Sequence, residues 1–269
     1  MLVELVQHQR RCVMDIVWLA SYPKSGNTWL RFLLYSVMHG PPAQSLDIAR
    51  KIPDIHRPLP TDVMNDERII AKSHYAFSEK HPKASDTERA VLIIRHPRDV
   101  LFSALNYRRL AGLTTAQMSD AQYARLFIAH KGDPEFNAQG FGTWEGHIQS
   151  WNNQTDFPIH LVRYEELKSD TAAHLRAVLD FLEIDAPQSA IDKAIEASSF
   201  DSMRAMEIRE KHNSAANPKS QSLFVGNPKS KTYFMNAGKT GHTLRSISPD
   251  LESAFNKSFA ESMQRYGYE

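Results

Sequence analysis

Short apolar runs alternate along this chain with longer segments that carry apolar residues at helical spacing. The runs have the length and the side chains of buried parallel strands. Strands that alternate with helices in this way predict an α/β fold with a mostly parallel, doubly wound sheet flanked by helices. The expected strands are 16–20, 68–74, 90–95 and 159–164, and the expected helices are 30–38, 97–105, 144–151, 171–183, 188–198 and 249–265.

Polar segments interrupt this alternation and predict the variable parts of the fold. We expect 43–67 and 112–140 to be loops with short or broken helices, and 211–232, rich in Asn, Ser, Lys and Pro, to be a mobile loop. Residues 1–13 precede the first strand and are predicted to be an N-terminal extension. The remainder, 14–269, is then expected to be one domain whose loops select the substrate.

The charge balance limits what such a fold can bind. A formal net charge of +1 predicts no broad basic surface and hence no nucleic-acid partner, so any anion site has to be built locally. The single cysteine, Cys12, suits a reducing compartment, which predicts a cytoplasmic location. No apolar run has the length of a membrane-spanning helix, so we expect no transmembrane segment.

The loop between the first strand and the first helix has the composition of an anion site. It reads Ser-Tyr-Pro-Lys-Ser-Gly-Asn-Thr-Trp over 21–29. A helix start offers free N–H groups and a positive dipole end, to which Lys24 adds a cation, while Gly26 lets the backbone approach a ligand. Neutral donors come from Ser25, Asn27 and Thr28. An ordinary turn capped by Ser25 or Thr28 is the alternative.

A second anion motif follows the third strand. Arg95 ends that strand, at the sheet edge where open α/β folds bind ligands, and Ser103 lies two helical turns later. Both side chains can face one phosphate, with Arg95 providing a charge-assisted fork. Asp99 shares the helix face of Ser103. A salt bridge at the strand end is the simpler interpretation of Arg95.

Lys72 and His74 are two residues apart on a predicted strand, so their side chains leave on the same face. A histidine with a pKa near its usual value of about 6.5 is neutral at physiological pH and can accept a proton. A packed or capping role is the alternative for a single histidine. His96 is the next candidate, but its place before Pro97 predicts a helix cap.

Together these motifs resemble the cytosolic-type sulfotransferases that use 3′-phosphoadenosine 5′-phosphosulfate (PAPS). The resemblance rests on Pro23–Trp29, on Arg95 with Ser103, and on Lys72-Ser73-His74. It implies transfer of a sulfuryl group from PAPS to a hydroxyl of a small molecule, leaving adenosine 3′,5′-bisphosphate (PAP) and needing no metal. In that family the histidine is the general base, the lysine of Lys-x-His contacts the sulfuryl group, and the loop lysine, here Lys24, stabilises the leaving phosphate.

The resemblance also implies residues around the adenine and at the 3′-phosphate. Trp29 would stack on the base, with Tyr164 from 162–167 and Ser198 and Phe200 from 198–203 nearby. The family's Phe-Met-Arg-Lys-Gly reads Phe-Met-Asn-Ala-Gly over 234–238, so Gly238 is kept and the two cations are absent. Lys239, Lys229 or Lys231 could replace them.

Two other functions stay open at this point. A non-catalytic nucleotide-binding or scaffold protein is compatible with the substituted Asn236-Ala237 pair. A P-loop kinase would need the Walker order, in which the lysine follows the last glycine, whereas Lys24 precedes Gly26. The 211–232 loop resembles that of bacterial members acting on natural products, which predicts such an acceptor. A homodimer stays open, because the dimerisation motif of animal members has no clear match.

Overall fold

The computed structural model describes residues 14–58, 60, 66–112, 117–216, 222–224, 232–236 and 238–268. Its four strands are β1 (Asp15–Ser21), β2 (Arg68–Ser73), β3 (Thr87–Ile94) and β4 (Ile159–Arg163). They pair in the order β2-β1-β3-β4, and every pairing is parallel. The expected extension 1–13 lies outside the described residues.

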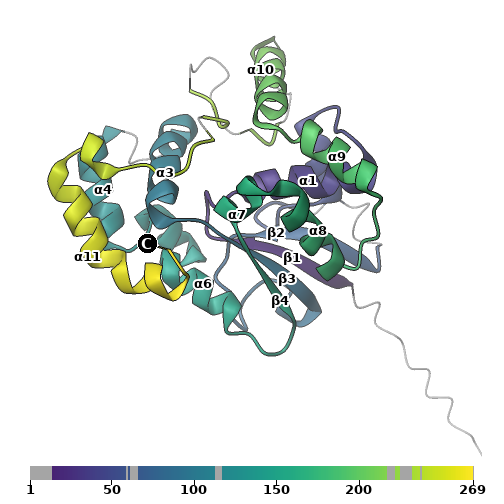
Figure 1. Cartoon of the computed structure of the whole chain (residues 1–269), viewed down its shortest axis with the longest axis horizontal. Helices are drawn as coiled ribbons and strands as arrows, with labels where there is room; N and C mark the ends of the chain where they lie inside the picture. The colour runs from purple at the N-terminus through teal and green to yellow at the C-terminus, as the bar shows by residue number, and fades with distance from the viewer. Residues whose placement is uncertain are drawn as a thin grey trace, which may run out of the picture.

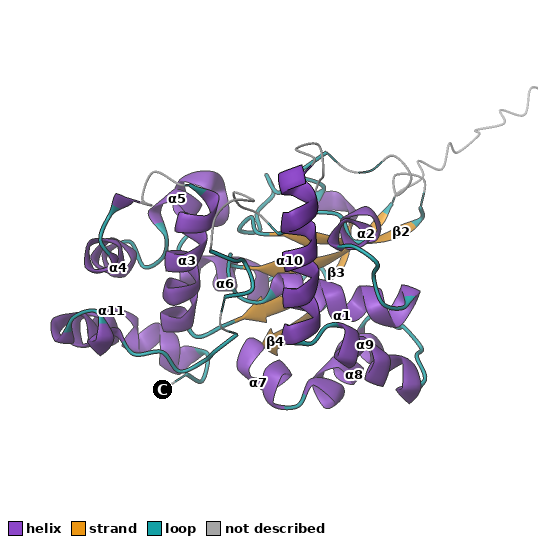
Figure 2. Cartoon of the chain, turned by 90° about the horizontal axis from the view of Figure 1, so that it is seen from above, coloured by secondary structure: helices purple, strands orange, loops and turns teal. Residues whose placement is uncertain are grey.

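Helices and short turns connect and cover the strands (Figure 2). The helix after the second anion motif begins at Pro97, as the sequence predicts, whereas the helix after the first begins at Asn27, three residues before the expected start, with Gly26 as its N-cap. In chain order the elements are α1 (Asn27–His39), α2 (Ser45–Lys51), η2 (Ala84–Asp86), α3 (Pro97–Ala111), α4 (Asp120–Ala129), α5 (Pro134–Phe136), η4 (Asn137–Phe141), α6 (Trp144–Asn152), α7 (Tyr164–Ser169), α8 (Thr171–Phe181), α9 (Gln188–Ala197), α10 (Phe200–Ala216), η5 (Leu244–Ser246) and α11 (Pro249–Arg265).

The sheet is the middle of three layers, with helices on both of its faces (Figure 1). Successive residues of a strand point to opposite faces, so neighbouring residues of β1 pack against different helices. Val17 and Leu19 of β1 pack in one cluster with α1, α8 and α9. Ile16, Trp18 and Ala20 pack in the other, with α3, α4, α6 and α11. Burial on both faces explains the continuous apolar runs of the sequence and confirms the expected α/β fold.

Two details differ from the sequence-based expectation. Tyr164, expected as the last residue of the fourth strand, instead begins α7, which follows β4 directly. The segment predicted as a mobile loop from 211 starts inside α10, which continues to Ala216. Much of 217–231 lies outside the described residues. The sequence did not predict α10, because this helix has no apolar stripe. Its apolar contacts come from Met203 and Met206, which pack in one cluster with Phe32 and Ile48.

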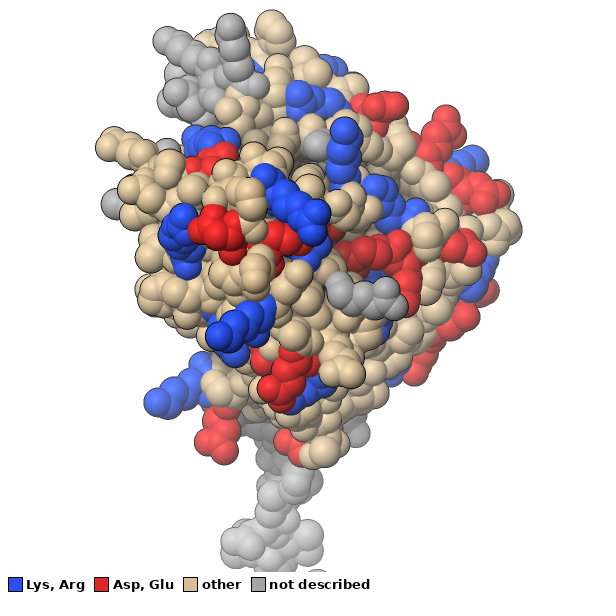
Figure 3. All heavy atoms as spheres, turned by 60° about the vertical axis from the view of Figure 1, so that its left-hand side comes forward, with Lys and Arg blue, Asp and Glu red and all other residues tan. Residues whose placement is uncertain are grey.

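The surface shows the balanced charge of the sequence. On the side that carries α4 and α11, cationic and anionic side chains are interspersed (Figure 3), and pairs such as Arg125–Asp250 and Arg265–Glu145 join elements there. Across the described ranges, no helix combines the length and the apolar character that crossing a membrane requires.

Candidate active site

A cavity of about 480 Å³ opens at the carboxyl ends of the strands. Parallel pairing places these ends together, so the β1–α1 loop, the end of β2 and the end of β3 meet at its base. Its walls include most of the residues chosen from the sequence. These are Lys24, Gly26, Asn27, Thr28, Trp29, Lys72, His74, Arg95, Ser103, Tyr164, Phe200, Gly238 and Lys239. Ser25 and Ser198 do not line it, and both are buried.

The β1–α1 loop has a backbone that needs glycine at one position. Gly26 has a φ of 102°, in the left-handed region, and a Cβ there would lie 2.4 Å from the Tyr164 ring. That ring in turn lies 4.3 Å from the Arg95 guanidinium carbon, so it is held from both sides. Gly26 therefore allows the loop and the aromatic ring to touch, besides leaving space for a ligand.

Asn27 has a different use from the one expected. Its side-chain amide donates to the Leu19 carbonyl at 2.8 Å and to Ser21 Oγ at 3.1 Å, fastening the helix start to β1. Both hydrogens of the Asn27 side-chain amide are therefore donated within the protein and are not available to an anion. The backbone N–H groups of Asn27 and Thr28, at the start of α1, make no hydrogen bond within the described residues and remain suited to an anion.

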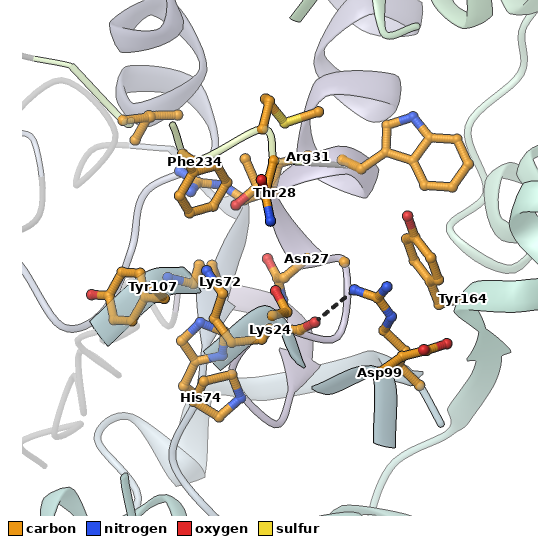
Figure 4. Close-up of a pocket in the computed structure, with 18 of the residues that line it drawn as sticks. Lys24, Asn27, Thr28, Arg31, Lys72, His74, Asp99, Tyr107, Tyr164 and Phe234 are labelled. Atoms are coloured by element: carbon orange, nitrogen blue, oxygen red, sulfur yellow. Dashed lines mark hydrogen bonds between the residues drawn. The ribbon is translucent and has the colours of Figure 1, made fainter. Parts of the chain in front are cut away.

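Lys24 is enclosed between two aromatic rings. Its Nζ lies 4.2 Å from the ring centres of both Tyr107 and Phe234 (Figure 4). Burial lowers the pKa of Lys24 to about 7, and the nearby charges of Lys72 and Arg95 lower it as well. A phosphate or sulfate group in the cavity would favour the protonated amine.

Lys72 is paired with a carboxylate that sequence reasoning did not select. Its Nζ lies 2.6 Å from Asp54 Oδ2, and an isolated parallel bridge joins the two backbones. Burial acts to raise the pKa of Asp54, but the charge and hydrogen bond of Lys72, together with the nearby His74 and His56, outweigh it and lower the pKa, so the carboxylate is ionised. Asp54 stands in a Pro-punctuated segment without periodicity, and no sequence signal pointed to its contact with the end of β2.

His74 is held so that one ring nitrogen is free to accept a proton. Its Nδ1 lies 2.7 Å from the Ser21 carbonyl oxygen, which can only accept, so Nδ1 carries the hydrogen. Nε2 then carries a lone pair. Burial and the charge of Lys72 lower the pKa of His74 well below its usual value, so the ring is neutral at physiological pH.

Two other histidines help to define the role of His74. His56, also on the cavity wall, accepts the backbone N–H of His74 at 2.9 Å through Nε2. His96 caps α3, its Nδ1 accepting the Arg98 backbone N–H at 3.1 Å, as the sequence predicted. The geometry thus separates the proton-accepting His74 from a supporting and a capping histidine.

Arg95 joins the two sides of the cavity. Its guanidinium donates to the carbonyl of Lys24 at 3.3 Å and to that of Lys239 at 2.9 Å. Trp144 Nε1 donates to the carbonyl of Arg95 and fixes its backbone. Ser103 lines the same end of the cavity. The two residues predicted to face one phosphate are therefore brought to one cavity.

Aromatic side chains form the part of the cavity next to Arg95. The rings of Trp29 and Tyr164 meet edge to face, with centres 5.6 Å apart, and Phe200 approaches Gly238 so closely that a Cβ there would lie 2.8 Å from the ring. Trp29 Nε1 donates to the carbonyl of Ser198. Ser198 is thus a support for the indole, and the flat apolar walls suit a purine base.

Charged side chains from neighbouring elements hold the C-terminal loop, which we define as residues 234–242. Glu207, fully buried on α10, accepts the backbone N–H groups of Phe234 and Met235. Lys168 donates to the carbonyl of Gly238 at 2.6 Å. Asn236 lines the cavity, whereas Ala237, Lys229 and Lys231 lie outside the described residues.

The described residues of the cavity fit a ligand with several negative charges. Cationic side chains outnumber carboxylates, and the buried Nε atoms of Arg31 and Arg95, two residues that line the cavity, have no hydrogen-bond partner in the described structure. Burying cations without partners is costly, so the excess favours a bound polyanion. The cations are Lys24, Arg31, Arg57, Lys72, Arg95 and Lys239, against Asp54 and Asp99.

Comparisons with known proteins agree with this chemistry. A family model described as "Sulfotransferase domain" matches residues 14–267. "Amine sulfotransferase" of Oryctolagus cuniculus is 23% identical over 261 residues, covering 94% of this chain and 82% of that protein. "Sulfotransferase 2A1" of Rattus norvegicus is 28% identical over 259 residues, covering 93% and 84%. The solved mouse sulfotransferase SULT7A1 complexed with PAP shares the fold, with a TM-score of 0.64 at 22% identity, covering 93% and 84%.

Proposed function

Because the chain belongs to the sulfotransferase family, it is a PAPS-dependent enzyme that transfers a sulfuryl group to a small-molecule acceptor, and we propose that the cavity at the strand ends is its active site. One observation carries the proposal. His74 presents a free Nε2 in the same cavity as the ammonium groups of Lys24 and Lys72. A proton acceptor beside two cations is what sulfuryl transfer to a hydroxyl needs.

In this mechanism His74 removes the acceptor proton. Nε2 accepts it as the acceptor oxygen forms a bond to sulfur and the bond from sulfur to the phosphate oxygen breaks. The Ser21 carbonyl holds Nδ1–H and stabilises the imidazolium that forms. Its low pKa keeps His74 ready as a base, and Asp54 favours the charged ring after transfer.

The two lysines balance the charge that moves during transfer. Lys24 lies in the β1–α1 loop, beside the open N–H groups of α1, and would neutralise the leaving phosphate. Lys72, on the strand that leads to His74, would contact the transferring group. Asp54 fixes Lys72 until an anion competes for its ammonium group.

The rest of the cavity would bind the nucleotide and the acceptor. Arg95 and Ser103 are assigned to the 3′-phosphate, and the Trp29, Tyr164 and Phe200 end to the adenine. Tyr107, Phe136, Gln139 and Phe141 also line the cavity, close to His74 or Lys24 on its acceptor side. A small molecule with an aromatic or alicyclic body and a hydroxyl group suits this mixture.

Three finer assignments accompany the proposal and come from the sequence. We place the protein in the cytoplasm, because a single cysteine suits a reducing compartment. A natural product is the proposed acceptor class, tested by screening hydroxylated aglycones with PAPS. A homodimer is tested by sedimentation of the full chain.

Calorimetric titration of PAP, with AMP and Mg²⁺–ATP as comparison ligands, tests the site. We expect PAP to bind at least tenfold more tightly than AMP, because a charge-assisted contact contributes about 1.5–3 kcal/mol. Arg95→Ala should remove most of this preference while leaving AMP binding nearly unchanged. Equal affinity of the unmodified protein for PAP and AMP would overturn the site assignment.

A further inference from the structure

We propose that His242, held by Asp99, is a 3′-phosphate-binding residue of this protein that acts as an imidazolium, so that PAP or PAPS binding takes up a proton. This inference rests on the proposed function, because it concerns the same nucleotide site. The sequence did not single out His242, and its role follows from the way in which the C-terminal loop meets α3.

Asp99 is an anion at the end of the cavity assigned to a phosphate. It is 2% exposed and lines the cavity with Arg95 and Ser103. An unpartnered carboxylate there would repel a phosphate. Instead, Oδ2 accepts the backbone N–H of Gly241, while Oδ1 accepts that of His242 and lies 2.7 Å from His242 Nδ1. Hydrogen bonds from the C-terminal loop therefore satisfy both oxygens of this carboxylate.

The same contacts fix the orientation of the His242 ring. A carboxylate accepts, so Nδ1 carries a hydrogen and Nε2 is the free nitrogen. The ring stacks on Phe102, with centres 4.7 Å apart and planes 18° apart. Its side chain is 28% exposed and lines the cavity, and within the described residues Nε2 makes no hydrogen bond.

Because Nε2 is the free nitrogen of His242, phosphate binding there changes the number of protons that the ring carries. With Nδ1–H committed to Asp99, neutral His242, which lines the cavity, would carry a lone pair on Nε2. A phosphate oxygen is an acceptor, so contact requires a hydrogen on Nε2 as well. A phosphate that contacts Nε2 therefore binds the imidazolium form, and the proton comes from solvent when the free ring is neutral.

The charges around His242 make this protonation responsive to a ligand. Asp99 is the anion in contact with the ring, and the cations Arg95 and Lys239 line the same cavity. Arg98 donates to the His242 carbonyl, and Glu252 of α11 pairs with Arg98 and accepts the Leu244 N–H. Around His242, the cations Arg95, Lys239 and Arg98 therefore outnumber the anions Asp99 and Glu252. A bound phosphate dianion would add two negative charges and put the anions in excess.

This arrangement also addresses the two cations that the loop lacks. Asn236 and Ala237 stand where related proteins are expected to carry Arg and Lys, and a third cation beside Arg95 and Lys239 would restore part of the lost attraction. Burial acts to raise the pKa of Asp99, but the hydrogen bonds from His242 and Gly241 and the charge of Arg95 together outweigh it and lower the pKa. The pair is therefore ionised on the Asp99 side and ready to support a cation.

His242→Asn is the informative substitution. The asparagine Nδ2 can replace Nδ1–H toward Asp99, so the loop keeps its anchor, whereas the Nε2 position is lost. His130→Asn, at the exposed C-terminus of α4, changes the same residue type away from the cavity and is the control. Thermal melting of both variants checks that the fold is kept.

PAP and AMP are titrated by calorimetry at pH 6 and pH 8.5, in buffers with different ionisation enthalpies. At pH 6 we expect His242→Asn to weaken PAP binding about 10- to 100-fold, the loss of one charge-assisted hydrogen bond, and to leave AMP binding unchanged. At pH 8.5 the loss should shrink to a few-fold. Near pH 7 the variant should take up fewer protons with PAP than the unmodified protein, whereas His130→Asn should match it.

The outcomes separate this inference from the proposed function. If the unmodified protein binds PAP more tightly than AMP but His242→Asn changes neither PAP affinity nor proton uptake, His242 is not a phosphate ligand. A loss that is equal at both pH values would show a structural role and overturn the imidazolium. Absence of any PAP preference in the unmodified protein would instead reject the proposed function.

Discussion

The strand-end region, residues 22–26 and 72–74, and the C-terminal loop, residues 234–242, face the same cavity but are held in different ways. The former continues from buried parallel strands, and its shape is set by backbone pairing and by the close fit of Gly26 to Tyr164. The described part of the latter has no helix or strand. Its backbone is held by charged side chains from other elements, among them Arg95, Asp99, Lys168, Arg204 and Glu207.

This difference in support matches the two tasks that we propose, with the strand-end region assigned to the chemical step and the C-terminal loop to nucleotide binding. Groups that must meet reacting atoms within a fraction of an ångström stand on the rigid side, since small displacements cost much of the rate. A loop held by individual charged contacts can be released at a small free-energy cost, which suits a segment that covers a nucleotide. Substitutions in the strand-end region should therefore mainly affect turnover, and substitutions that release the C-terminal loop should mainly affect ligand affinity.

The largest effect is expected from His74→Ala. Loss of a general base typically reduces turnover about 10²- to 10⁴-fold, and here the base is the only assigned proton acceptor. PAP affinity should stay close to that of the unmodified protein, because the predicted nucleotide contacts lie elsewhere in the cavity. Steady-state kinetics with PAPS and an identified acceptor, together with PAP calorimetry, measure both quantities.

The control for this change is His130→Ala, which removes a histidine from an exposed helix end. It should retain full turnover. If His74→Ala kept full kcat, the base assignment would fail. A loss of PAP affinity as large as the loss of kcat would remove the separation between the two regions.

The next largest effect is expected from Glu207→Gln on the loop side. The Glu207 carboxylate accepts two backbone N–H groups while fully buried, and the amide can replace only one of these contacts. An unmet buried donor costs about 1–3 kcal/mol, so PAP affinity should fall about 5- to 150-fold. Turnover at saturating PAPS should change much less.

Arg209→Gln is the matched comparison, because it alters a charged but exposed residue two positions along the same helix. PAP affinity should be unchanged in this variant. An unchanged affinity in Glu207→Gln would instead show that the loop does not depend on its buried anchor. Calorimetry on both variants distinguishes these results.

The same division explains what the sequence could predict. The strand ends could be predicted because buried strands have continuous apolar runs and because Lys24, Lys72, His74 and Arg95 lie at or shortly after the ends of these runs. The partners of the loop could not be predicted, since Glu207 and Phe234 are 27 positions apart and meet only in the folded structure. A long-range contact between two segments without periodicity leaves no local pattern.

Asp54 and His242 illustrate the same limit at single residues. Asp54 reaches Lys72 through one isolated bridge, and His242 acquires a role only beside Asp99, 143 positions away. Asn27 shows the opposite error, because a loop donor expected to face an anion is used to fasten the loop to β1. Residue type and spacing identified the region, but tertiary contacts decided which atoms remain free.

The smallest expected effect is a pH dependence that arises in the strand-end region. Lys24 has a pKa of about 7 between its aromatic neighbours, so above this pH the free enzyme progressively loses the ammonium that PAPS requires. kcat/KM for PAPS reports the free enzyme and should fall about fivefold between pH 7 and pH 8, because the protonated fraction of a group with this pKa falls from about a half to about a tenth. Bound PAPS favours the protonated amine, so kcat should stay level to a higher pH.

The measurement is best made in the His242→Asn background, where proton uptake in the C-terminal loop cannot contribute. His74 is neutral throughout because its pKa lies well below its usual value, so a fall on the alkaline side belongs to a group that must be protonated. Adding Lys24→Arg should remove the fall, since a guanidinium keeps its proton. A kcat/KM that is level from pH 6 to 9 before this second change would show that Lys24 is not the titrating group, and a fall that survives Lys24→Arg would assign it to another residue.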